Sequence, residues 1–206
     1  MDAIQKLVET EAIKQVKARY ARAVDTKDWD LLESVFTQDA RSVYNDGAFA
    51  FEGRDEILKF LKGALDTTEV VSMHQSHTPE IEITGETTAR GTWYLEDIVI
   101  NEGGTTEYNT ASSVMVGTGL YHDEYVKVDG EWRISVTGYE RIFEYRTPMH
   151  ADAELVTRWS QRGDQSSTDS RILGGRGVDR PQGATAPRIA SISSSSKAEP
   201  SGLKTS

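Results

Sequence analysis

Apolar positions near the start of the chain recur with the period of an α-helix. Between residues 2 and 24 they fall three or four positions apart with Lys and Glu between them, which predicts one long amphipathic helix. The run Asp25-Thr-Lys-Asp28 interrupts it, and either aspartate is suited to cap a second helix over residues 29–36. A third helical pattern opens at residues 53–56 and ends near Gly63.

The pattern changes to that of strands in two parts of the chain. Residues 40–45 and 48–52 flank Asp46-Gly47, a hairpin-turn signal. From Val70 onward, extended patterns cover residues 70–77, 80–83, 89–101, 110–128 and 132–145. Helices followed by long antiparallel strands predict an α+β fold, in which the helices pack on one face of a strongly curved sheet.

The end of the chain differs from the rest in composition. No Phe, Trp or Tyr follows Trp159, and Ser, Gly, Thr, Pro and Arg dominate residues 161–206. Such a segment buries too little apolar surface to offset its ordering entropy. We therefore expect one domain over residues 1–150 and an extension over residues 151–206 that is disordered from about residue 160.

Charge and composition exclude several classes of function. The net charge is −10, and residues 161–206 hold seven basic and four acidic residues, so residues 1–160 carry −13. A body this acidic repels phosphodiester backbones, which argues against nucleic-acid binding. The absence of cysteine excludes disulfides and cysteine-ligated zinc. No apolar stretch approaches the roughly 20 residues that span a bilayer, and residues 1–12 lack a signal-peptide core. We expect a cytoplasmic protein.

Two of the four histidines, His74 and His77, lie in one predicted strand and can be interpreted in three ways. As metal ligands they would face opposite sides of a regular strand, with no acidic ligand beside them, which argues against a metal site. As ordinary strand residues, one would pack and one would be solvated. As a catalytic base, one would face a pocket beside an orienting carboxylate. Strand parity does not choose between the two histidines, because a bulge at Pro79 would reset the phase.

Six further positions also allow two interpretations each. Asp25 is either a helix cap or a carboxylate facing a cavity at the break between two helices, and Tyr20 either shares that cavity or is a core aromatic. Arg141 has the parity of Tyr139 on the last predicted strand, and it is either solvated or turned inward beside a partner. Tyr44, Trp93 and Tyr108 suit a core or a pocket wall. Because the chain has no phosphate loop, nucleophile elbow or dinucleotide fingerprint, a nucleotide cofactor is not supported.

Several separate segments together resemble a known family. The stretch around Tyr20 and Asp25, the His74 strand, and the late segment from Tyr121 to Ile134 resemble the SnoaL-like branch of the nuclear-transport-factor-2-like superfamily. Within that branch, residues 72–83, 91–97 and 137–142 are most similar to bacterial bile-acid 7α-dehydratases. Hexachlorocyclohexane dehydrochlorinases and scytalone dehydratase are more distantly similar. The resemblance covers about residues 5–146.

The resemblance implies a cone-shaped α+β fold around an apolar pocket, and a dehydratase that needs no metal or organic cofactor. His74 would be the catalytic base, Asp25 its partner, and Tyr20 and Arg141 catalytic groups. The substrate would be a hydroxylated 3-oxo steroid or related polycyclic ketone, either free or joined to coenzyme A. The alternatives are a dehydrochlorinase, an isomerase, a polyketide cyclase or a non-catalytic binding module. Family members often form trimers, so we expect a homotrimer. The expected substrate contacts are Tyr44, His77, Trp93, Tyr108 and Tyr139.

Overall fold

The computed structural model describes residues 1–103, 108 and 111–156 of the 206-residue chain. Its helices are α1 (Ala3–Thr26), α2 (Trp29–Ser34) and α3 (Arg54–Leu65). Its strands are β1 (Phe36–Tyr44), β2 (Phe49–Glu52), β3 (Val70–Ile83), β4 (Thr88–Asn101), β5 (Ser113–Val128) and β6 (Glu131–Pro148).

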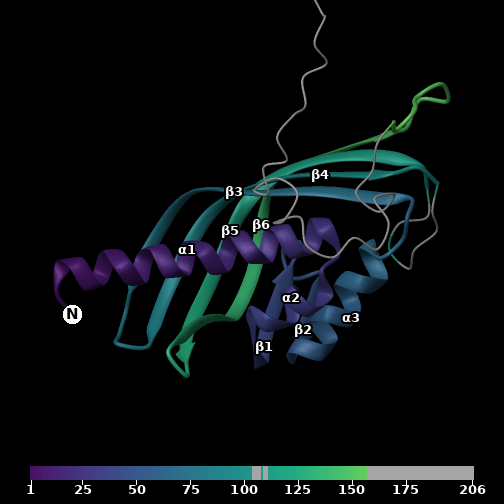
Figure 1. Cartoon of the computed structure of the whole chain (residues 1–206). Coiled ribbons are helices and arrows are strands. Elements are labelled where there is room, and N and C mark those ends of the chain that lie inside the picture. The colour runs from purple at the N-terminus through teal and green to yellow at the C-terminus, as the bar shows by residue number, and fades with distance from the viewer. Residues whose placement is uncertain (104–107, 109–110, 157–206) are drawn as a thin grey trace, which may run out of the picture. The chain divides into compact units, whose positions relative to one another are not determined.

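The strands form a mixed, curved and unclosed sheet. Their order is β2-β1-β6-β5-β4-β3, so the sheet ends at β2 and β3. Only the β1–β6 pair is parallel among the strands of the described chain, and the other neighbours are antiparallel. Helix α1 crosses one face of the sheet, which we call the inner face (Figure 1). The predicted α+β fold class is confirmed.

Helix α1 is stabilised by its buried apolar residues and by its N-cap. Asp2 accepts a hydrogen bond from the Gln5 amide, and such a cap contributes about 1 kcal/mol. Ile13, Val16 and Val24 face the sheet and are buried. The period seen in the sequence therefore reports the buried face from Ile13 onward, but it is wrong for the first turns, where Ile4, Leu7 and Val8 are exposed.

The second helix is shorter than the sequence predicts. It ends at Ser34, and Phe36 already pairs with Ile134 at the start of β1. Phe36 is completely buried, so its place in the sheet core outweighs the helical pattern that includes it. The cap of α2 is Asp28, which accepts from the Leu31 amide at 3.1 Å. This assignment leaves the Asp25 carboxylate available for another partner.

Strand β3 joins two segments that the sequence suggests are separate, and a bulge lies between them. The β3–β4 register shifts between His77 and Glu80, and Thr78 has φ of 40°. Two β3 residues then oppose one residue of β4, which changes the side-chain phase along the strand. Before the bulge the partly buried phase contains Ser72 and His74, and after it the phase contains Ile81 and Ile83. The phase change suggested by Pro79 is therefore present.

Part of the predicted domain organisation lies outside the described residues. The expected disorder from about residue 160 falls within residues 157–206, none of which the structure describes. Within the described residues, no helix combines the length and apolar character that crossing a membrane requires.

Candidate active site

Asp25 and His74 meet between the last turn of α1 and the inner face of β3. The His74 Nδ1 atom lies 2.7 Å from Asp25 Oδ1, and the two side chains are 14% and 21% exposed. Because an ionised carboxylate only accepts hydrogen bonds, Nδ1 carries the proton in this contact. Nε2 of a neutral imidazole then has a free lone pair, and it makes no hydrogen bond with any described residue. This is the arrangement of an oriented general base.

Two further donors hold the Asp25 carboxylate in place. The Ser72 hydroxyl donates to Oδ1 at 2.9 Å, and the His74 backbone amide donates to Oδ2 at 2.8 Å. A carboxylate in the last turn of a helix is destabilised by the negative end of the helix dipole, and these two hydrogen bonds offset that cost. Both oxygens of Asp25 are thus fixed by residues of one strand, and the imidazole orientation is fixed with them.

Lys27 makes a second link between the end of α1 and the start of β3. It caps α1 in the left-handed conformation, with φ of 57°, which costs a residue with a side chain about 1–2 kcal/mol. Its ammonium donates to the carbonyl of Val70 at 2.8 Å and to that of Thr67. Lys27 therefore fixes the entry of the strand that carries Ser72 and His74.

Arg141 faces inward and is paired, as the second interpretation of the sequence requires. Its Nη1 and Nη2 atoms donate to Oδ1 and Oδ2 of Asp97 at 2.6 and 2.8 Å. Both side chains are almost fully buried, at 9% and 4% exposure. Burial lowers the pKa of the Arg141 guanidinium, but the hydrogen bonds and charge of Asp97 outweigh it and raise that pKa above its ordinary value. Arg141 is a permanent cation in this site.

The space for this ion pair comes from a glycine. A β-carbon at Gly117 would lie 2.3 Å from Arg141 Nη1 and 2.6 Å from Asp97 Oδ1. Gly117 pairs with Asp97 across the β4–β5 ladder. Any larger residue there would therefore occupy the path by which the arginine reaches its carboxylate.

Four tyrosines form a cluster beside the ion pair of Arg141 and Asp97. Tyr20 and Tyr44 have hydroxyl oxygens 3.5 Å apart, and the Tyr121 ring lies edge-on to both Tyr20 and Tyr139. The Arg141 guanidinium lies 4.6 Å from the centre of the Tyr139 ring. Burial raises the pKa of Tyr20 and of Tyr44 well above 10, so both remain protonated hydrogen-bond donors at neutral pH.

Three of the expected substrate contacts lie elsewhere or have other partners. His77 lies on the opposite face of β3 from His74 because both precede the bulge, and its side chain is 45% exposed beside Glu96. Trp93 faces inward, but its indole N–H donates to Tyr125 at 3.1 Å. Tyr108 packs against the Phe60 ring, and its chain neighbours are outside the described residues. We therefore remove His77 from the expected substrate contacts.

Four residues of this region were not singled out in the sequence: Ser72, Asp97, Gly117 and Lys27. For Asp97 a signal exists, because β4 alternates strictly and Asp97 shares the phase of the buried Trp93 and Leu95. Ser72 shares the phase of His74 in the same way. The roles of Gly117 and Lys27 depend on contacts with distant segments, which no local pattern reports.

The described residues contain no cluster of three or more histidine, aspartate or glutamate side chains arranged for a metal ion.

Comparison with known proteins places the chain in a family. Residues 5–137 match the family described as the SnoaL-like domain. A protein of Novosphingobium aromaticivorans, provisionally described as a scytalone dehydratase, has a similar structure, with 26% identity and a TM-score of 0.60. That match covers 74% of this chain and 95% of the other.

A second similar structure is a hexachlorocyclohexane dehydrochlorinase of Novosphingobium barchaimii, with 18% identity and a TM-score of 0.60. The match covers 76% of this chain and 99% of that one, and at this identity it supports the fold alone. Since the family match extends over most of the described residues, the chain belongs to the SnoaL-like domain family.

Proposed function

We propose that this protein is a cofactor-independent hydro-lyase that removes water from a hydroxylated carbonyl compound. The observation that carries the proposal is the 2.7 Å contact between His74 Nδ1 and Asp25 Oδ1, with Nε2 left available as a base. The similarity to a protein provisionally described as a scytalone dehydratase supports a lyase activity. The finer proposal, carried by the sequence resemblance, is a bile-acid 7α-dehydratase-like reaction on a hydroxylated 3-oxo steroid or related polycyclic ketone.

The reaction would begin at His74. Nε2 takes a proton from the carbon next to the hydroxyl-bearing carbon, and the electron pair of that C–H bond forms the new double bond. The C–O bond breaks, and the departing hydroxide takes up the proton held by the His74 imidazolium, directly or through solvent. It leaves as water, and His74 returns to its neutral form. The ionised Asp25 stabilises the imidazolium that forms. Such general base catalysis contributes about 10²–10⁴-fold to a rate.

The buried tyrosines and Arg141 would stabilise the charge that develops on oxygen. Tyr20 and Tyr44 are protonated, so either hydroxyl can donate to a substrate carbonyl or to the departing hydroxide. The two hydrogen bonds to the Asp97 carboxylate hold the Arg141 guanidinium in one position, and together the two side chains form a fixed ion pair. Preorganised donors of this kind act without reorganisation during the reaction.

The test is a substrate screen with two matched histidine variants. The purified protein is incubated with 7-hydroxy-3-oxo-4-ene steroids and with β-hydroxy ketones, and loss of one water is followed by mass spectrometry. On a substrate that the screen identifies, we expect His74→Ala to lose at least about a hundredfold in kcat/KM. His77→Ala lies on the same strand but on the other face, and should retain activity. Undiminished turnover by His74→Ala would refute the proposed mechanism.

One rival has a structural observation in its favour. The dehydrochlorinase likeness shows that this fold is also used by a protein described as removing HCl. The same base would serve both reactions, which differ in the leaving group. Including a hexachlorocyclohexane in the screen separates them, because chloride release without water loss favours the rival. Saturable steroid binding without conversion would instead favour a non-catalytic binding module.

The homotrimer implied by the sequence resemblance remains a proposal. Phe143 and Tyr145 on β6 expose 53% and 62% of their surface and are candidates for burial between copies. Light scattering coupled to size exclusion measures the mass directly. We expect a trimer for the wild type and a lower mass for Phe143→Asp. A monomeric wild type would contradict the proposal.

A further inference from the structure

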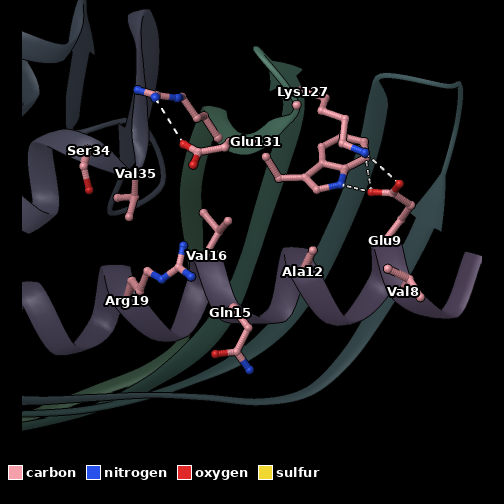
Figure 2. A pocket seen from close by; sticks show the side chains of 13 residues that line it. Val8, Glu9, Ala12, Gln15, Val16, Arg19, Ser34, Val35, Lys127 and Glu131 are labelled. Atoms are coloured by element: carbon pink, nitrogen blue, oxygen red, sulfur yellow. Dashed lines mark hydrogen bonds and ion pairs between the residues drawn. The ribbon is translucent and has the colours of Figure 1, made fainter. Parts of the chain in front are cut away.

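A cavity lies on the side of the fold where α1 meets the end of α2 and the β5–β6 hairpin. It has a volume of about 500 Å³, within the range of about 300–1,000 Å³ for small-molecule sites. None of the residues assigned above to the candidate active site lines it. Figure 2 shows Val16, Ala12, Glu9 and the Arg19 guanidinium on the same side of α1. We call this cavity the α1 cavity.

The apolar part of the α1 cavity is continuous with the core. Ala12, Val16, Val35 and Trp132 line it, and the last three are nearly completely buried. Val8, at the edge of the cavity, is 56% exposed. Val8 and the partly buried Ala12 therefore offer apolar surface to a ligand, whereas Val16, Val35 and Trp132 expose only a few per cent of theirs.

The one buried carboxylate of the cavity is fully engaged. Glu9 accepts hydrogen bonds from Lys127 at 2.7 Å to each oxygen, from the Trp132 indole at 2.6 Å and from Gln5 at 2.6 Å. Figure 2 shows the Lys127 and Trp132 bonds closing on this carboxylate. Lys127 and Glu9 thus neutralise each other, and neither is available to select the charge of a ligand.

Two arginines have unused hydrogen-bonding capacity. Arg19 makes no hydrogen bond or ion pair with any described residue. Arg133 has only a long contact to Glu131 at 3.5 Å, and its Nε atom is buried without a hydrogen-bond partner in the described structure. A buried donor without an acceptor carries a desolvation cost, which an acceptor from a ligand would remove. Because Glu9 pairs with Lys127 and Glu131 contacts Arg133, the charged lining of the cavity keeps one net positive charge.

We propose that the α1 cavity binds a small organic anion that has an apolar body, with its carboxylate between Arg19 and Arg133. The guanidinium groups would supply charge-assisted hydrogen bonds, which are stronger than bonds between neutral groups. The apolar body would lie against Val8 and Ala12, the lining residues with exposed apolar surface. The site goes beyond the proposed dehydratase reaction, because it shares none of the residues assigned to that reaction.

The test measures binding by isothermal titration calorimetry on the full-length protein, with octanoate as the probe. Octan-1-ol is the neutral control and inorganic sulfate is the control without an apolar body. We expect octanoate to bind at one site and both controls to bind at least about tenfold more weakly. Arg19→Gln and Arg133→Gln should each weaken octanoate binding about tenfold or more.

Two matched variants test whether octanoate binds in the α1 cavity rather than elsewhere on the protein. Arg22→Gln removes a charge from the same helix at a residue that does not line the cavity, and it should bind octanoate as the wild type does. His74→Ala should also bind normally, so a failed dehydratase proposal leaves this test intact. The proposal is overturned if octanoate does not bind, if octanol or sulfate binds equally well, or if binding survives both Arg19→Gln and Arg133→Gln. Arg19 is exposed on α1, so Arg19→Gln keeps the test valid if Arg133→Gln misfolds.

Discussion

His74 and Asp97 are direct cross-strand partners on the inner face of the β3–β4 ladder. Cβ atoms of such partners lie about 4.5–5.5 Å apart. Each also has an ionic or hydrogen-bonded partner from a distant segment, Asp25 for the histidine and Arg141 for the aspartate. An imidazolium at His74 would therefore lie beside two carboxylates, one of which is already neutralised by an arginine.

Replacing Asp25 with asparagine should disable the histidine while leaving the fold intact. An amide can donate to Nδ1 and so favours the wrong imidazole tautomer, and it cannot stabilise an imidazolium. We expect kcat to fall by about 10²–10⁴-fold, a range typical of general base catalysis, with a smaller change in KM. The control is Asp28→Asn, because asparagine also caps helices. Equal kinetics in the two variants would remove Asp25 from the mechanism.

Gly117→Ala should disturb the ion pair between Arg141 and Asp97 without replacing either charged residue. The added β-carbon would collide with both Arg141 Nη1 and Asp97 Oδ1. Overpacking of this kind costs about 1–3 kcal/mol of unfolding free energy, and displacement of the arginine should lower kcat as well. Urea unfolding and steady-state kinetics measure the two effects. Ser112→Ala, an exposed change just before β5, should alter neither; wild-type behaviour of Gly117→Ala would show that the pair has room to move.

Lys27→Gly should separate activity from stability. Glycine relieves the left-handed backbone cost of about 1–2 kcal/mol, which offsets the two lost hydrogen bonds at about 1 kcal/mol each. The unfolding free energy should therefore change by less than about 1 kcal/mol, while kcat falls because β3 is no longer fixed at its entry. Lys27→Arg keeps a donor and should restore kcat. A proportional loss of stability and activity in Lys27→Gly would indicate a purely structural residue.

The ion pair of Glu9 should give a defined acid dependence of stability. Hydrogen bonds from Lys127, and then from Trp132, hold the pKa of Glu9 below its ordinary 4.5 despite burial. The unfolded state then binds more protons than the folded state as pH falls below 4.5, so the stabilisation by Glu9 is present above that pH and is lost as pH falls through the folded pKa. We expect Glu9→Gln to be less stable than wild type at pH 7.

The difference between Glu9→Gln and wild type should shrink as the solution is acidified below pH 4.5. Urea unfolding at a series of pH values measures it, and Glu11→Gln, an exposed neighbour on α1, is the control. A difference that stays constant across this range would mean that the charge of Glu9 does not contribute.

The sequence by itself determined the succession of helices and then strands, the buried face of α1 from Ile13 onward and the α+β class, because each depends on local periodicity. It also suggested the bulge near Pro79, but it left the direction of Arg141 open. Only the tertiary structure decided which groups meet. Asp25 is 49 residues from His74, and Asp97 is 44 residues from Arg141. Contacts between segments so far apart depend on sheet order, strand register and the space left by Gly117. Local patterns predict which face of a helix or strand a side chain lies on. The packing of distant segments decides which residues it contacts there.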